Sequence, residues 1–299
     1  MSRFTEKSLP SSGESLRDRG LARLVWLNAL SRATGMLFSW NPPGPLKGIL
    51  FRLFVRCTGI DLSDSRKELK EFSSIGELFA RHLRPGARPL GAGFVSPADG
   101  VVRKSGLING GRAVQAKGLT YSANQLIDTG QAGAAPGLFA TIYLAPKSYH
   151  RVHSPLDGDL LKIQYVPGTL CPVSPPFDRV VPDLFVRNER LVFTIEDGET
   201  GGLIWLVMVG GINVGKMASP YMPDFTTNSL DAPAKRRMSV ERRVPLQKGD
   251  ELGNFMLGST VVLLFDKKFA QKHSPAFLPE GSPVLMGHSL FIHSGNAEL

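Results

Sequence analysis

The chain has 299 residues, of which 42% are hydrophobic and 20% charged, a composition typical of a globular protein rather than a disordered one. This length suits one large domain or two small ones with a substantial buried core. The net charge of +9 indicates an anionic partner, either nucleic acid or an anionic membrane surface. The two cysteines cannot build a disulfide framework, which favours a reducing compartment. We find neither a secretory signal nor an apolar stretch long enough to span a bilayer.

The N-terminal region predicts two amphipathic helices after a polar tail over residues 1–15. Residues 16–41 have apolar side chains at helical spacing and end at the break Pro42-Pro43-Gly44-Pro45. The apolar face of the second helix follows an i, i+3, i+4, i+7, i+8 pattern: Leu46, Ile49, Leu50, Leu53 and Phe54. Basic residues beside such faces suit the interfacial layer of an anionic membrane. Packing on the protein's own core is the alternative, and the excess of arginine slightly favours the membrane.

The remainder of the chain predicts a β-rich body. Ser74 to Glu77 form a capping box that predicts a helix running to about Leu83. Beyond Pro89, short apolar runs alternate with Gly, Pro, Asn and Asp: 138–144, 160–166, 191–195, 203–209 and 261–265. We therefore expect an α+β fold, with a mostly antiparallel β core domain preceded by N-terminal amphipathic helices.

Three separated segments carry residues suited to chemistry. The turn at residues 96–100 contains Asp99, residues 149–155 contain His150 and His153, and residues 257–260 contain Ser259 directly before the buried strand. Each segment alone has an ordinary structural explanation. Together they supply an acid, a histidine and a serine, the parts of an activated hydroxyl nucleophile. Nucleic-acid binding is disfavoured because no recognisable binding motif accompanies the positive charge.

The three segments together resemble phosphatidylserine decarboxylase, the pyruvoyl-dependent membrane enzyme. Further stretches are similar to family segments and occur in family order: Phe79 to Pro85, Gln115 to Gly118, Tyr165 to Gly168 and Pro182 to Arg190. The resemblance extends from about residue 15 to the C-terminus. It implies a bacterial-type proenzyme, a carboxy-lyase that converts phosphatidylserine into phosphatidylethanolamine and CO2.

The resemblance implies that the precursor cuts itself between Gly258 and Ser259. The Ser259 hydroxyl would attack the carbonyl carbon of Gly258, with His153 as the base and Asp99 orienting and stabilising its imidazole. Glycine suits the attacked position because it leaves the carbonyl unshielded. Elimination and hydrolysis would then leave a covalent pyruvoyl group at position 259. No metal is implied.

The implied decarboxylation passes through a Schiff base between that pyruvoyl group and the substrate amine, with the conjugated carbonyl system as electron sink. Reprotonation of the substrate carbon requires an acid. His150 is the candidate proton donor, and the alternative gives both duties to His153.

The expected organisation follows from the cleavage site and the charge. Residues 1–65 would form the tail and the membrane-associating helices, and residues 66–299 the catalytic domain. Cleavage would give a large β chain (1–258) and a small α chain (259–299) from the same precursor. We expect a peripheral protein on the cytoplasmic face of a bacterial inner membrane, acting on phosphatidylserine there. The resemblance further implies a homodimer.

Rival interpretations remain open at this point. A zinc-dependent hydrolase could use His150, His153 and Asp99, although the segment around Ser259 would then have no role. A non-enzymatic lipid-binding β module would use only the basic helices and the positive charge. A pyruvoyl enzyme acting on a soluble amino acid would leave the amphipathic helices unexplained.

Overall fold

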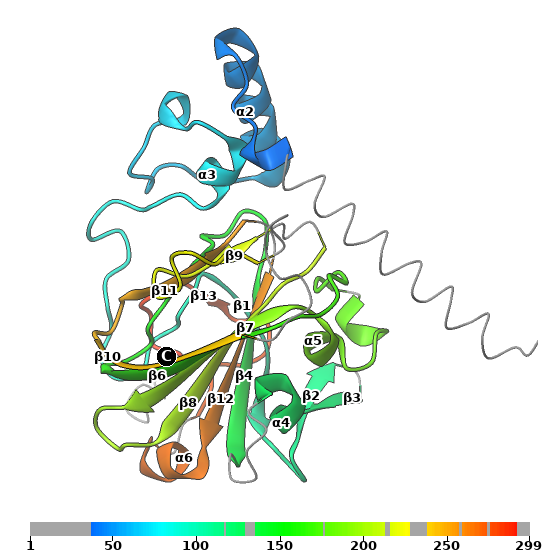
Figure 1. Cartoon of the computed structure of the whole chain (residues 1–299), viewed down its shortest axis with the longest axis vertical. Helices are drawn as coiled ribbons and strands as arrows, with labels where there is room; N and C mark the ends of the chain where they lie inside the picture. Colours follow the sequence, from blue (N-terminus) through cyan, green and yellow to red (C-terminus); the bar gives the residue numbers. More distant parts are fainter. Residues whose placement is uncertain are drawn as a thin grey trace, which may run out of the picture.

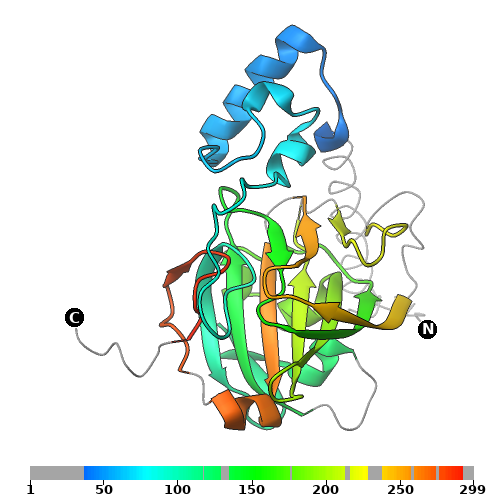
Figure 2. The same ribbon diagram turned by 90° about the vertical axis from the view of Figure 1, so that its left-hand side faces the viewer.

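The computed structural model describes residues 37–116, 118–128, 135–175, 177–212, 216–227, 238–256, 259–273 and 276–291. A small helical module lies above a larger β body, and the two are joined by the segment that follows α3 (Figures 1 and 2). The first predicted helix lies mostly outside the described residues; of its predicted span, 37–39 are helical. The predicted division at residue 65 stays a prediction.

The helical module contains α2 (Gly44–Thr58), the short 3-10 helix η1 (Leu69–Glu71) and α3 (Ile75–Phe79). Helix α2 begins directly after Pro43, and proline in its first turn costs no hydrogen bond there. It ends at Gly59, which adopts φ 71° and donates its N–H to the Val55 carbonyl at 2.9 Å, a left-handed cap that suits glycine. The module has its own hydrophobic core: Phe51, Ile60, Phe72, Leu78 and Phe79.

The predicted apolar face of α2 is divided between two environments. Leu50 and Phe54 pack against the small core of the module. Leu46, Ile49 and Leu53 instead remain 41%, 59% and 56% exposed. One helix therefore packs on the protein's own core along one side and presents an apolar stripe along another.

The capping prediction for α3 is confirmed for the N-cap Ser74, whereas the Glu77 carboxylate accepts from the Ser73 N–H instead of completing the box, and the predicted end of the helix is wrong. The Ser74 hydroxyl accepts from the Glu77 N–H at 3.1 Å, as expected of an N-cap. The helix stops at Phe79 rather than near Leu83. The next residues pair with an earlier segment instead, because the His82 carbonyl accepts from the Arg66 N–H at 2.9 Å. This tertiary pairing overrides the local helical signal.

The β body is built on an eight-stranded antiparallel sheet in the order β10-β6-β7-β8-β12-β4-β1-β13. Its strands, in chain order, are β1 (Gly100–Leu107), β4 (Pro136–Leu144), β6 (Gly158–Val166), β7 (Arg190–Asp197), β8 (Leu203–Val209), β10 (Met238–Leu246), β12 (Ser259–Asp266) and β13 (Pro283–Val284). A second sheet has the order β5-β11-β9, and β2 pairs with β3. The α+β class with a mostly antiparallel β core is confirmed.

The remaining elements are short and surround this sheet. They are β2 (Arg112–Ala116), β3 (Leu119–Ser122), α4 (Ala123–Ile127), β5 (Arg151–His153), η2 (Phe177–Arg179), α5 (Leu184–Arg187), β9 (Met217–Ala218), β11 (Glu251–Phe255) and α6 (Lys267–His273). Figure 1 shows α4 and α5 beside one face of the large sheet and α6 at its lower end.

Strand β12 explains the uninterrupted apolar run from Val261 to Phe265. The strand lies between β4 and β8, and all five side chains are 0% exposed. Val261, Leu263 and Phe265 face one hydrophobic core, whereas Val262 and Leu264 face another on the opposite side of the sheet. A central strand covered on both faces requires apolar residues at every position. The strand begins at Ser259, two residues before the predicted run.

Candidate active site

Residues 145–150, here called the histidine loop, are flanked by two contacts to described residues near the predicted cleavage site. At one end of the loop, Leu144 pairs with Ser259 in the β4–β12 register. At the other end, the His150 carbonyl accepts from the Phe255 N–H at 2.9 Å. The ends of the loop are therefore joined to Phe255 and to Ser259. Gly258, half of the predicted cleavage site, lies outside the described residues.

Ser259 differs from the other buried serines of the described chain. Ser65, Ser96, Ser154 and Ser219 are also at most 5% exposed, and each donates its hydroxyl to a backbone carbonyl at 2.7–2.8 Å. Ser259 is 0% exposed, yet its Oγ has no hydrogen-bond partner among the described residues. A buried hydroxyl without a partner is costly. The Thr141 and Thr260 hydroxyls share this property, and Ser259 is distinguished from them by its place at the first position of β12.

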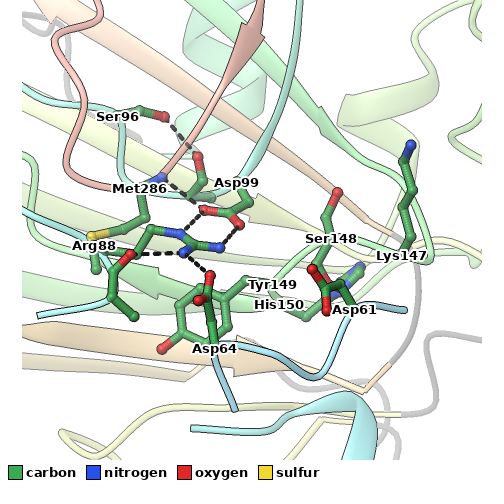
Figure 3. Close-up of polar contacts among 12 residues, drawn as sticks. Asp61, Asp64, Arg88, Ser96, Asp99, Lys147, Ser148, Tyr149, His150 and Met286 are labelled. Atoms are coloured by element: carbon green, nitrogen blue, oxygen red, sulfur yellow. Dashed lines mark hydrogen bonds and ion pairs between the residues drawn. The ribbon is translucent and has the colours of Figure 1, made fainter. Parts of the chain in front are cut away.

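Asp99 is held by an arginine. Its two carboxylate oxygens accept from Arg88 Nε at 3.1 Å and Nη2 at 2.8 Å, and the Met286 N–H donates to Oδ1 at 2.8 Å. Arg88 also binds Asp64 at 2.8 Å, so its guanidinium lies between two carboxylates (Figure 3). Hydrogen bonding to Asp99 raises the pKa of Arg88. The following Gly100 lets β1 approach β4 closely, because a Cβ there would lie 2.5 Å from the Tyr143 carbonyl oxygen.

His153 is buried with one nitrogen free to act as an acceptor. Its Nδ1 lies 2.7 Å from the Gly249 carbonyl, which only accepts, so Nδ1 carries the proton in the neutral ring. Nε2 then accepts from the Tyr149 hydroxyl at 3.1 Å. Burial lowers the pKa of His153, which favours this neutral form. The nitrogen that a general base would use is therefore Nε2.

The structure brings the predicted triad together only in part. The His153 N–H donates to the Pro97 carbonyl at 2.9 Å, so the turn that carries Asp99 is fixed to β5. The Asp99 side chain nevertheless bonds to Arg88 and Met286 rather than to the His153 ring. Within the described residues, the orienting contact implied by the resemblance is absent. The roles of Asp99, His153 and Ser259 stay predictions.

His150 occupies the most enclosed position of the loop. It is 0% exposed, and its ring centroid lies 4.0 Å from that of Phe79 in the helical module. Nδ1 lies 2.8 Å from the Ser148 carbonyl and therefore carries the proton, whereas the buried Nε2 has no partner in the described chain. Burial lowers the pKa of His150 to about 3. The ring is neutral at physiological pH and offers an unused lone pair.

Three residues of this site were missed by the sequence reasoning. Tyr149 lies within residues 149–155, but the sequence does not indicate that its hydroxyl bonds to the His153 ring four positions later. Arg88 carried no signal, because its partners lie 11 and 24 positions away in the chain. Arg81 lay in a segment used only for the resemblance, yet it is 4% exposed and contacts the histidine loop.

The zinc alternative receives no support from the donor geometry. In the part of the chain that the structure describes, no group of three or more His, Cys, Asp or Glu residues is arranged to hold a metal ion. His150 and His153 each direct Nδ1 at a backbone carbonyl, and Asp99 is bound to an arginine.

Among the described helices, none combines the length and apolar character needed to cross a membrane.

Comparison with known proteins places the chain in a family. The family model described as phosphatidylserine decarboxylase matches residues 75–292. A phosphatidylserine decarboxylase proenzyme of Anaeromyxobacter sp. (strain K) is 45% identical over 249 residues, which cover 82% of this chain and 87% of the relative. The proenzymes of Acidovorax ebreus and Chromobacterium violaceum are 40% and 38% identical, over 83% and 88% of this chain and 87% and 94% of their own lengths. The resemblance seen in the sequence is confirmed, and the chain belongs to the phosphatidylserine decarboxylase family.

Proposed function

We propose that this chain decarboxylates phosphatidylserine after cutting itself between Gly258 and Ser259. The observation that carries the proposal is the Ser259 hydroxyl: buried, without a partner among the described residues, and located at the start of the central strand. The two ends of the histidine loop contact Phe255 and Ser259, which lie on either side of residues 257 and 258 in the sequence. Family membership supports the same reaction.

The self-cleavage step uses groups whose protonation states suit it. His153 Nε2 is a neutral acceptor that takes the Ser259 hydroxyl proton once it exchanges its bond to Tyr149. The Ser259 oxygen attacks the Gly258 carbonyl carbon, and the amide nitrogen leaves with a proton, giving an ester. Loss of the α-proton of residue 259 then breaks the ester C–O bond and releases a carboxylate at Gly258. Tautomerisation and the addition of one water release ammonia and leave the pyruvoyl group.

Asp99 stabilises the charged form of His153 without touching it. Burial has the largest effect on the pKa of His153 and lowers it, whereas the hydrogen bond to the Gly249 carbonyl, the charge of Glu251 and, to a smaller degree, the charge of Asp99 raise it. Arg88 forms an ion pair with the Asp99 carboxylate, so the positive charge of Arg88 weakens the electrostatic effect of Asp99 on His153. We infer that Asp99 is a positioning and electrostatic residue for the imidazole in the uncut chain.

The surroundings of Ser259 fit a covalent pyruvoyl group. Residue 259 is paired with Leu144 and fully enclosed, and the unpaired Thr260 hydroxyl next to it can donate to a carbonyl oxygen. That group supplies an electrophilic carbonyl for the substrate amine and a sink for the electron pair left when CO2 departs. Position 259 is fixed by its pairing with β4, and the strand that follows it lies between β4 and β8 from Thr260 onward.

The free Nε2 of His150 suits proton transfer at the substrate. The serine headgroup arrives as an ammonium ion, and its nitrogen must lose a proton before it can bond to a carbonyl carbon. Nε2 of His150, unpaired among the described residues, takes this proton once the negative charge of the bound substrate raises the pKa that burial lowers in the empty site. After CO2 has left, the same nitrogen returns the proton to the substrate α-carbon. This assigns His150 to turnover rather than to maturation.

The exposed stripe of α2 supports binding at a membrane surface. Leu46, Ile49 and Leu53 face outward, and Lys47 and Arg52 line a neighbouring cavity of about 400 Å³. Apolar side chains beside cations are the pattern of an interfacial helix on an anionic bilayer. We propose peripheral attachment to the cytoplasmic face of the inner membrane. The homodimer implied by the resemblance stays a prediction.

The activity is tested with vesicles of phosphatidylserine labelled at the serine carboxyl. We expect the purified chain to release labelled CO2 and to leave phosphatidylethanolamine in the vesicles. The Ser259→Ala chain should remain uncut and release none. Release of CO2 by an uncut polypeptide would overturn the proposal.

A further inference from the structure

A basic cavity of about 390 Å³ lies where the helical module meets the β body. The residues that line it come from the segment before η1, from α3 and the turn after it, and from β5: Arg66, Lys67, Phe72, Glu77, Ala80, Arg81, His82 and Arg151. Arg151 lies between His150 and His153 in the sequence, so the cavity is adjacent to the active site described above. Its lining is rich in cations, and none of them has a role in the self-cleavage or decarboxylation steps proposed above.

Arg81 is a buried cation without a counterion. It is 4% exposed, and its two terminal nitrogens reach only the carbonyls of Ser148 and Lys147, at 3.5 and 3.4 Å. Its buried Nε has no partner, and no ion pair joins Arg81 to a carboxylate among the described residues. Asp99 and Asp61 act on this charge only at a distance. A buried charge that no anion contacts is destabilising, and a bound anion would offset its desolvation. Burial accordingly lowers the pKa of Arg81.

The other cations of the cavity divide into paired and unpaired groups. Lys67 is bound to Glu77, and Arg151 is bound to Glu251. Arg66 is exposed, and its guanidinium has no carboxylate partner in the described part of the chain. Two guanidinium groups, Arg66 and Arg81, therefore remain available. Guanidinium groups bind phosphate oxygens with bidentate geometry.

We propose that this cavity binds a phosphate group through Arg66 and Arg81, and that in the working enzyme this is the phosphate of the lipid headgroup. The second half of the inference rests on the proposed function. One oxygen and one methylene carbon join the phosphate of phosphatidylserine to the carbon that loses CO2, so the two must bind close together. The Ser148 carbonyl provides that proximity, because it accepts from both Arg81 and His150.

The substrate carboxylate is the less suitable occupant. Decarboxylation removes the negative charge of that group, so a guanidinium bound to it would stabilise the ground state more than the transition state. The phosphate keeps its charge throughout the reaction. Binding energy at the phosphate is therefore uniform, and its loss should appear in KM rather than in kcat.

The first experiment measures binding without activity. Inorganic phosphate is titrated into the purified full chain, and the Tm is compared with that in chloride at equal ionic strength. We expect phosphate to raise the Tm by a few degrees in the parent protein, because a ligand of the folded state stabilises it. Arg66→Gln should lose this increase. Arg179→Gln, which removes the same charge from an exposed arginine outside the cavity, should keep it.

The second experiment distinguishes the lipid phosphate from a free one. With phosphatidylserine in mixed micelles, Arg66→Gln should cut itself normally, keep its kcat and show a KM raised about tenfold, the effect of losing one charge-assisted hydrogen bond. Arg81→Lys tests the buried cation with its charge retained and should raise KM as well. A normal KM together with a lost Tm increase would assign the cavity to free phosphate.

Unchanged KM and unchanged phosphate response in Arg66→Gln would overturn the inference. Absence of CO2 release by the parent chain would instead contradict the proposed function and leave the Tm result to decide on the cavity.

Discussion

The β body and the helical module use hydrophobic residues in opposite ways. Strand β12 buries every side chain from Val261 to Phe265 completely, with a separate hydrophobic core on each face of the sheet. The module buries only a small cluster around Phe51 and leaves Ile49 and Leu53 more than half exposed. On the proposed function, we expect the body to hold the reacting residue in a fixed position and the module to present a surface to the substrate.

The two regions meet at the histidine loop. Phe79 of the module packs on the His150 ring, and the Arg151 Nε donates to the Ala80 carbonyl at 2.9 Å. If the proposed function is correct, this contact joins the part of the chain that meets the lipid bilayer to the loop that carries His150. Substitutions in the body should therefore abolish chemistry, and those in the module should weaken access to substrate.

The largest effect is expected at Ser259. Ser259→Ala removes the attacking hydroxyl, and we expect complete loss of self-cleavage and of CO2 release, seen by denaturing electrophoresis and labelled-carboxyl assay. Ser219→Ala is the matched control, because it removes another buried serine hydroxyl, one bonded to the Leu252 carbonyl at 2.7 Å. The control should cleave and turn over. Cleavage of the Ser259→Ala chain at the same bond would show that the Ser259 hydroxyl is not the attacking group and that Ser259 does not differ from Ser219 in this respect.

The next effect separates the two histidines. His150→Ala should leave self-cleavage intact and lower kcat by roughly 10²–10⁴, the usual contribution of a positioned proton-transfer group. His153→Ala should leave the chain uncut, because Nε2 of that ring takes the serine proton. The two variants are compared by the fraction cleaved after purification and by CO2 release. Uncleaved His150→Ala protein would contradict this division of roles.

A smaller effect is expected from the exposed face of the module. Ile49→Asp places a negative charge on a residue that is 59% exposed, and we expect binding to anionic vesicles to fall about tenfold, through loss of apolar contact and charge repulsion. Leu107→Asp is the control, because Leu107 is 66% exposed on the β body. Co-sedimentation with vesicles at low salt measures both. Equal loss in the two variants would mean that α2 has no special role.

A further effect concerns stability at low pH, where activity is not involved. The pKa of His150 is about 3 in the fold and about 6.5 in an unfolded chain, so the unfolded state binds more protons between these values. The resulting stability is fully present above the unfolded pKa and is lost as pH falls toward the folded one. Between pH 7 and 5, His150 should lower the free energy of unfolding by about 2 kcal/mol.

Urea denaturation of the uncut Ser259→Ala chain measures this change, with Ser259→Ala/His150→Gln as the reference. His153 contributes in the same direction to both proteins, because its pKa is also lowered by burial. The difference in pH dependence therefore reports His150 alone. Identical pH dependence in the two chains would show that His150 is accessible to protons in the folded state.

Much of the β body could be predicted from the sequence because its strands are covered on both faces or alternate regularly. The run over residues 203–209 coincides with β8, and the run at 261–265 lies within β12. The end of α3 could not be predicted, because the residues after Phe79 pair with a segment near Arg66 that is distant in sequence. Local patterns contain no information about such a pairing.

The candidate site was predictable as a set of residues but not as a set of contacts. Asp99, His150, His153 and Ser259 came from motif resemblance, which identifies residue types in order. Arg88 binds the Asp99 carboxylate, and the Tyr149 hydroxyl bonds to His153 Nε2. Both interactions depend on distances that only the folded chain defines. The lack of any partner for Ser259 Oγ is likewise visible only once its neighbours are known.

The central claim is that Ser259 converts the peptide bond before it into a chain break and a ketone. Intact mass measurement of the purified, denatured protein tests this most directly. We expect two species, one ending at Gly258 with a free carboxylate and one whose first residue has the mass of a pyruvoyl group in place of serine. A single full-length mass from protein that releases CO2, or a small chain beginning with unmodified serine, would contradict the account.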